Sequence, residues 1–400
     1  MKIAFITAEF LPARISSSYI YEDLFTHLIK QGHSVDVYCS NPIKGLSSRE
    51  IKKFNKDSQY NHKGINIHTF RSLATTNSYW MRLFNYIFVG IKLSKKIKKI
   101  DIDCAILPSF PPVFFQRQLL KRLHKMKVTT ILNLHDLFPD NSLRKDSLLY
   151  KVMNFYNVKN LCSFDFIVSI SDDISDTLIS KGVDISKIRR INLWEFSYSS
   201  NNYDVEETSL DSFDSTKFNV CYIGNIGRYQ NISMLLDLAD SFESDDTNFV
   251  FVGDGPLKQM VIRRAQNNKN IQYFERVTYD QALCLYRQSD VNIISLNNNV
   301  IFTACPSKTS NCIGAKKPIL AIVNMESKYA QMILDHKLGL VADPTSISSI
   351  MDALCKIKDD VSEYTGHYVD FYEKSINLKK WNEIMICLEK HLKNEKKEKY

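Results

Sequence analysis

The stretch that organises this chain reads CPSKTSNCIGAKKP over residues 305–318, followed directly by the apolar run ILAIV over residues 319–323. Pro306 or Ser307 can open a helix, because proline lacks the amide that a first helical turn leaves unpaired and serine can cap that turn. The Lys-Lys-Pro that ends the stretch closes the helix, and the apolar run is predicted to form a buried strand. A helix amino end that carries free amides, a hydroxyl and Lys308 is suited to phosphate. An ordinary helix–strand unit with a solvated lysine fits the same residues.

The alternation of strand and helix continues through the rest of the chain. The segments Lys2–Ala8, Ile20–Lys30 and Ser34–Ser40 predict a strand, an amphipathic helix and a strand, which implies a right-handed parallel unit of a Rossmann-like sheet. A second series begins with the predicted strand Phe218–Ile223. Further strands are predicted at 65–70, 104–109, 129–136, 164–171, 183–188, 189–193, 248–252, 271–277, 291–296 and 339–344, further helices at 279–290, 346–358 and 364–392, and a surface excursion at 41–64.

Length and composition predict two domains. The chain has 400 residues, whereas single cores rarely grow beyond about 250–300 residues. Residues 196–216 shift to a polar composition rich in serine and acidic residues, which is typical of a boundary between domains. We therefore expect domains at residues 1–200 and 201–370, followed by a terminal helix at 371–400.

The Pro-Ser-Lys at residues 306–308, with its short helix and the Lys-Pro-Ile-Leu-Ala at 317–321, resembles the donor-binding segment of retaining glycosyltransferases of the GT-B fold. The likeness is to family 4-like bacterial enzymes that build O-antigens, capsules and other exopolysaccharides, and it runs from Met1 to about residue 343. It implies an α/β fold in which two Rossmann-like domains with parallel sheets face a central cleft. The first domain would lie on the acceptor side, the second would bind a nucleotide sugar, and the terminal helix would pack back toward the first.

The resemblance also implies a function and a site. The function is transfer of a sugar from a UDP- or GDP-sugar to a lipid-linked or saccharide acceptor in surface polysaccharide biosynthesis, with retention at the anomeric carbon. Glycines between a strand and a helix let backbone amides approach phosphates, and the loop after residue 223 has this composition. The catalytic residues implied are His135, Arg228 and Lys308, and the donor-binding residues are Gly224, Asn225, Gly227, Gly253, Glu275, Arg276, Ser307 and Asn311. We expect neither a metal nor another cofactor.

His135 and Asp136 follow a predicted strand, where ligands of open parallel sheets bind. In the family, a histidine at the position of His135 contacts the donor sugar near the reacting carbon. A histidine that only holds its own loop together is the competing interpretation.

Three departures from the family pattern keep other functions open. The family carries a lysine where Gln230 stands and two glutamates where Thr303 and Asn311 stand. An asparagine offers one acceptor oxygen where a carboxylate could accept from both ribose hydroxyls. A nucleotide-sugar 2-epimerase is one alternative, with Glu9, Asp136 and Asp140 as candidate carboxylates. A catalytically inactive binding scaffold is the other.

Composition restricts the partners and the compartment. Nine cysteines without a Cys-x-x-Cys pair indicate a reducing compartment, and the short apolar start predicts a strand and no signal peptide. The net charge of +8 suits an anionic partner, but no nucleic-acid-binding motif is present. The segment Trp80–Lys99 combines aromatic residues with clustered lysines, so it is either an interfacial helix at an anionic membrane or a helix that faces the core. We expect a cytoplasmic protein that is peripheral to the membrane at most.

Overall fold

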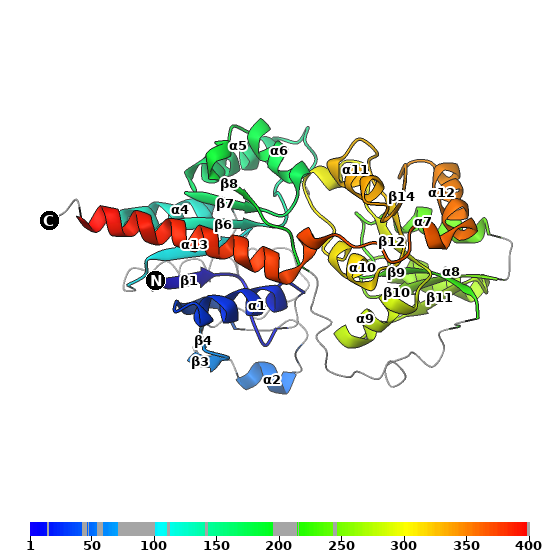
Figure 1. Cartoon of the computed structure of the whole chain (residues 1–400), viewed down its shortest axis with the longest axis horizontal. Coiled ribbons are helices and arrows are strands. Elements are labelled where there is room, and N and C mark those ends of the chain that lie inside the picture. Colours follow the sequence, from blue (N-terminus) through cyan, green and yellow to red (C-terminus); the bar gives the residue numbers. More distant parts are fainter. Residues whose placement is uncertain are drawn as a thin grey trace. The chain divides into compact units, whose positions relative to one another are not determined.

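The computed structural model describes residues 1–13, 16–41, 46, 48–53, 59–70, 101–109, 113–140, 143–194, 214, 216–242 and 246–397. The chain divides into two compact units, and the predicted α/β architecture of two domains with parallel sheets is confirmed (Figure 1). One unit comprises residues 1–170, 174–191 and 377–400, and the other comprises residues 171–173 and 192–376. The segment Trp80–Lys99, for which either an interfacial helix or a core-facing helix was predicted, lies outside the described residues.

The first unit is built on an eight-stranded sheet in the order β3-β4-β2-β1-β5-β6-β7-β8. Its strands pair in parallel except for β3, which runs antiparallel to β4 at the edge. The strands are β1 (Lys2–Ile6), β2 (Ser34–Ser40), β3 (Gln59–His62), β4 (Ile65–Phe70), β5 (Cys104–Pro108), β6 (Thr129–Leu134), β7 (Phe166–Ser169) and β8 (Ile188–Arg190). The helices are α1 (Ser16–Lys30), α2 (Ser48–Lys53), α4 (Val113–Lys125), α5 (Leu148–Ser163) and α6 (Asp172–Ser180), with the 3-10 helix η1 (Ile185–Lys187).

The second unit has a six-stranded sheet in the order β11-β10-β9-β12-β13-β14, and all of its strand pairs are parallel. Buried side chains form a core on each face of this sheet, as a parallel sheet covered by helices requires. The strands are β9 (Phe218–Ile223), β10 (Thr247–Val252), β11 (Ile271–Phe274), β12 (Val291–Ser295), β13 (Ile319–Ile322) and β14 (Gly339–Ala342). The helices are α7 (Ile232–Asp240), α8 (Lys258–Asn267), α9 (Tyr279–Gln288), α10 (Thr309–Ala315), α11 (Lys328–Asp335) and α12 (Ile347–Asp359), with 3-10 helices η3 (Val300–Phe302), η4 (Val361–Glu363) and η5 (Asp370–Tyr372).

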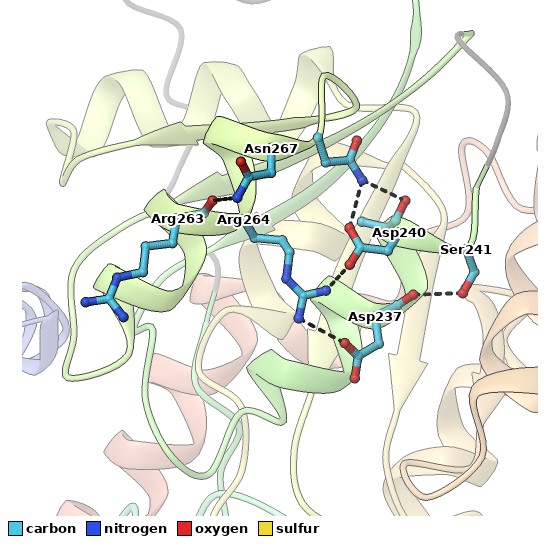
Figure 2. Close-up of polar contacts among 8 residues, drawn as sticks. Asp237, Asp240, Ser241, Arg263, Arg264 and Asn267 are labelled. Carbon is cyan, nitrogen blue, oxygen red and sulfur yellow. Dashed lines mark hydrogen bonds and ion pairs between the residues drawn. The ribbon is translucent and has the colours of Figure 1, made fainter.

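Helices α7 and α8 are joined by a network of charged side chains on their outer surface (Figure 2). The guanidinium of Arg264 pairs with the carboxylate of Asp240 and, at 3.2 Å, with that of Asp237. The amide of Asn268 donates to Asp240 at 2.8 Å. Because the partners are about one-third to one-half exposed, we assign this network to holding the two helices together, with a small contribution to stability.

The last helix, α13 (Lys374–Lys397), groups with the first unit from Asn377 onward. The ring of His27 and the side-chain oxygen of Asn382 lie 3.0 Å apart, which ties α13 to α1. The predicted helix at 364–392 was wrong at its start, because the 3-10 helix η5 lies in its first part and α13 begins only at Lys374. None of the helices in the described part of the chain is both long and apolar enough to cross a membrane.

Two further predictions of secondary structure were wrong. The excursion at 41–64 contains the helix α2 and the strand β3. The segment 183–188 contains η1, and only its last residue, Ile188, lies in a strand, β8, because the side chain of Asp184 accepts the amide of Ser186 and caps a helical turn.

Candidate functional site

The order of the second sheet singles out the carboxyl ends of β9 and β12. From β9 the chain proceeds outward to β10 and β11, and it then returns to the other side of β9 to form β12. Crevices beyond the carboxyl ends of strands at such a reversal are the usual ligand sites of open parallel sheets. The predicted residues Gly224, Asn225, Gly227 and Arg228 follow β9 directly.

Gly224 and Gly253 end the neighbouring strands β9 and β10, and their backbones lie against each other. Their φ angles are +139° and +145°, a region that favours glycine. A Cβ atom on Gly253 would come within 1.9 Å of the carbonyl oxygen of Gly224. Gly253 therefore permits the conformation of the loop after β9, and Gly224 forms part of that loop.

Lys308 brings a cation to this loop from a distant part of the sequence. Its Nζ atom lies 3.7 Å from the centre of the Tyr222 ring, and a Cβ atom on Gly224 would lie 3.4 Å from Nζ. Nζ is buried and has no hydrogen-bond partner in the described part of the chain. Burial lowers the pKa of Lys308 from its ordinary 10.5 to about 8, so the amine is still mostly protonated at pH 7.

The helix that follows Lys308 is shorter than its sequence pattern predicts. Helix α10 begins at Thr309 with Lys308 as its cap residue, whereas a start at residue 306 or 307 was predicted. The predicted closure was right, since Lys316 adopts the left-handed conformation after the helix and β13 follows. Ser307 is exposed just before the helix, and its carbonyl accepts the hydroxyl of Ser310 at 3.1 Å.

The two positions at which the family carries glutamates lie on either side of this turn. The hydroxyl of Thr303 donates to the carbonyl of Val300 at 3.1 Å, and Thr303 is buried. Asn311 is half-buried in the first turn of α10. Thr303 thus stabilises the turn that contains it. Asn311 places a side-chain amide on the helix that Lys308 caps.

The loop after β9 holds its charged side chain in solvent. Arg228 is exposed, and its carbonyl accepts the side-chain amide of Asn297 at 3.1 Å, which ties this loop to the one after β12. Asn225 donates to Gln230 at 3.3 Å. A Cβ atom on Gly227 would come within 2.4 Å of the side-chain amide of Asn225, so a side chain there would have to displace this amide.

Glu275 and Arg276 follow β11, at the edge of the sheet and two strands away from β9. Both are exposed. The carboxylate of Glu275 lies 3.6 Å from the ammonium of Lys258, which also pairs with the carboxylate of Asp254 at 3.3 Å. The predicted residues of the second unit therefore form two groups, one around Lys308 and Gly224 and one after β11. Lys258 was not among the residues predicted from the sequence, although it follows the predicted residue Gly253 by five positions.

His135 follows β6 in the first unit, at the carboxyl end of that strand as predicted. Its ring stacks on Tyr21, with centres 5.8 Å apart and planes within 6°. The hydroxyl of Tyr21 in turn accepts the amide of Asn133 at 3.1 Å. The Nε2 atom of His135 is buried and has no hydrogen-bond partner among the described residues. Burial lowers the pKa of His135 to about 4, so the ring is neutral at pH 7.

The loop after His135 is fixed by an ion pair that the sequence does not reveal. The carboxylate of Asp140 lies 3.0 Å from the ammonium of Lys181, and both side chains are largely buried. The hydroxyl of Tyr150 donates to the same carboxylate at 2.9 Å. Asn157 donates to the carbonyl of Phe138 at 2.5 Å. Asp140 therefore has a structural role in this loop, which weakens its case as a proton-transfer group.

Among the described residues, no cluster of three or more His, Cys, Asp or Glu side chains is arranged to hold a metal ion. Two of the predicted site residues instead have a buried polar atom without a hydrogen-bond partner in the described part of the chain: Lys308 in the second unit, through the cationic Nζ, and His135 in the first unit, through the neutral Nε2. The first suits an anion and the second suits a hydroxyl group.

Comparison with known proteins agrees with this arrangement. Residues 19–193 match the model of Glycosyltransferase Family 4, and residues 207–374 match that of Glycosyl transferases group 1. The chain is 23% identical over 297 residues to the probable glycosyltransferase WbjE of Pseudomonas aeruginosa, covering 71% of this chain and 73% of that protein. It is 24% identical to the putative colanic acid biosynthesis glycosyl transferase WcaI of Escherichia coli K12, covering 60% and 63%.

The fold also matches solved structures. The Anabaena protein HepE in complex with UDP and glucose superposes with a TM-score of 0.64 at 11% identity, covering 98% of this chain and all of that one. With the two family matches in the two units, this likeness assigns the fold. The chain belongs to the glycosyltransferases of the GT-B fold, with a family 4 part followed by a group 1 part.

Proposed function

We propose that this glycosyltransferase moves a sugar from a nucleotide-sugar donor to a lipid-linked or saccharide acceptor in bacterial surface polysaccharide biosynthesis, with retention at the anomeric carbon. The observation that carries the proposal is the buried, unpartnered ammonium of Lys308 beside Gly224. A buried cation without a partner is costly, so its retention at a ligand-binding edge favours an anionic ligand. The UDP bound to HepE and the names of WbjE and WcaI support the same function.

The proposed chemistry depends on stabilising the nucleoside diphosphate as it leaves. Lys308 and the exposed Arg228 would share its negative charge, and the backbone of the loop at Gly224 would lie against the phosphates. The acceptor hydroxyl would pass its proton to a phosphate oxygen, so this scheme needs no protein base. The neutral ring of His135 would orient the donor sugar through a hydrogen bond at Nε2.

The remaining donor contacts are those to the nucleotide base and to the ribose. The loop at Glu275 and Arg276 would receive the nucleotide base, chiefly through backbone groups. Asn311 would replace the usual carboxylate on the ribose and leave one ribose hydroxyl without its charged acceptor. We therefore expect weaker donor binding than a glutamate would give, and Asn311→Glu should strengthen it.

The family matches favour transfer over the two alternatives. An epimerase would need free carboxylates, and Asp140 is held by Lys181. One assay separates all three functions: incubation with radiolabelled UDP- and GDP-sugars and a saccharide or lipid-linked acceptor. Transfer gives labelled acceptor and free nucleotide, epimerisation gives a new sugar still bound to nucleotide, and an inactive scaffold gives neither. Labelled acceptor in the presence of the chain supports the proposal, and an epimerised donor refutes it.

A further inference from the structure

Helix α5, which is labelled in Figure 1, carries a row of exposed apolar side chains on one face. Leu148 and Phe155 are 77% and 54% exposed, and Leu149 and Val152 are also exposed. Residues 148, 152 and 155 follow a spacing of four and three, so they share one face of the helix. We call these four residues the α5 stripe.

The opposite face of α5 is the one that packs into the unit. The amide of Asn160 donates to the carbonyl of Val113 at 2.7 Å, and Asn157 donates to the loop after β6. Asn157 lies nine residues after Leu148, which is two and a half turns and so the other side of the helix. The helix therefore buries polar amides toward the protein and presents apolar side chains to solvent.

Basic side chains surround the α5 stripe. Arg144 and Lys145 precede the helix, and Lys151 and Lys159 lie along it, all of them exposed. The Nζ atom of Lys159 lies 3.9 Å from the centre of the Phe155 ring. The only acidic residue from 143 to 163 is Asp146, which pairs with Arg144 at 2.7 Å. Apolar side chains bordered by lysines match the surface of an anionic bilayer, in which the apolar groups enter the headgroup region and the cations meet lipid phosphates.

We propose that the α5 stripe docks the protein on an anionic lipid bilayer. This inference rests on the proposed function in one respect, since a lipid-linked acceptor would reach the enzyme at such a surface. A second copy of the chain is a poorer occupant, because the same face of the copy would bring a second set of lysines against the first.

The test is co-sedimentation of the full-length protein with phosphatidylcholine vesicles, with and without phosphatidylglycerol, at low and high salt. The test variant is Leu148→Ser/Phe155→Ser. Its matched control is Ile386→Ser, which alters a side chain of similar exposure, 53%, on α13. A second variant, Lys145→Gln/Lys151→Gln, keeps the apolar side chains and removes two charges.

We expect the wild type and Ile386→Ser to bind only the anionic vesicles, with less binding at high salt. Both α5 variants should lose binding by about tenfold or more, with unchanged circular dichroism. Equal vesicle binding by the wild type and Leu148→Ser/Phe155→Ser would overturn the proposal and assign binding to another surface. No vesicle binding by the wild type would also overturn it. A wild-type dimer in light scattering that this variant converts to a monomer would also overturn it in favour of a second copy.

Nucleoside diphosphate affinity, measured by calorimetry on the same samples without vesicles, separates this inference from the proposed function. Intact affinity with no vesicle binding would remove the α5 stripe as a docking surface and leave the donor site standing. Vesicle binding without nucleotide affinity would support the α5 stripe as a docking surface and remove the proposed donor site.

Discussion

Replacing Lys308 with methionine should stabilise the protein and weaken donor binding. The folded protein holds this ammonium out of solvent against the Tyr222 ring, without a hydrogen-bond partner among the described residues, and its pKa falls from 10.5 to about 8. One pH unit in a pKa corresponds to about 1.4 kcal/mol, so the buried charge costs the folded state about 3 kcal/mol at pH 7. Methionine keeps the apolar stem and the contact with the ring and removes the charge.

The gain in stability from Lys308→Met should depend on pH, because the lysine changes its protonation on unfolding. Between pH 8 and 10.5 the unfolded chain binds the proton of Lys308 more than the folded chain does, so the stability of the wild type rises with pH in this range. The advantage of Lys308→Met should therefore be largest below pH 8 and disappear near pH 10.5. Urea denaturation followed by circular dichroism gives the difference in unfolding free energy between Lys308→Met and the wild type at pH 7 and at pH 10.

Lys308→Met should weaken the binding of a nucleoside diphosphate, although it stabilises the protein. A charged hydrogen bond to phosphate contributes about 1.5–3 kcal/mol, so Lys308→Met should weaken UDP or GDP binding at least about tenfold. Lys316→Met is the matched control, because Lys316 is exposed just after α10 and should alter neither quantity appreciably. A Lys308→Met protein that is less stable than the wild type and binds nucleotide normally would refute the reasoning.

Three further predictions follow from the described contacts. His135→Ala should lower sugar transfer at least about tenfold while the melting temperature moves by only a few degrees, whereas a large fall in melting temperature with normal activity would support a structural role. Asp140→Ala should destabilise the protein by about 3–5 kcal/mol by leaving the buried ammonium of Lys181 without its counter-charge, and the double variant Asp140→Ala/Lys181→Met should recover part of that loss in urea denaturation; additive losses from the two substitutions would show that the two side chains do not interact. Gly253→Ala should cost more than about 1 kcal/mol and reduce nucleotide affinity, because its Cβ would collide with the carbonyl of Gly224; normal affinity would separate this contact from the donor loop.

Much of the fold follows from apolar runs bounded by turn residues. The strands Ser34–Ser40, Ile65–Phe70 and Phe218–Ile223 were predicted with the bounds that the structure has. The strand β3 was missed because Gln-Tyr-Asn-His has no apolar run, and it forms only by pairing with β4 at the edge of the sheet. Edge strands depend on such a partner more than on their own sequence.

The candidate site could be predicted only in part, because burial and pairing are tertiary properties. The sequence identified Lys308 as a candidate, but its burial beside Tyr222 joins two segments far apart in the chain. For the same reason Asp140 looked available as a carboxylate until Lys181 was found beside it. The short helix α10 was placed correctly by its closing Lys-Lys-Pro, whereas its start was set by the turn before Thr309.

The most direct test of the account is the titration of Lys308 itself. Protein labelled with ¹³C at lysine Cε can be titrated by NMR with and without UDP or GDP, and the Lys308→Met spectrum assigns the signal. In the free protein we predict a pKa near 8 for this lysine, and with the nucleoside diphosphate bound we predict a rise of at least one pH unit, because the phosphate favours the charged form. A Lys308 pKa that stays the same when saturating nucleotide is added would contradict the assignment of Lys308 to the donor phosphates.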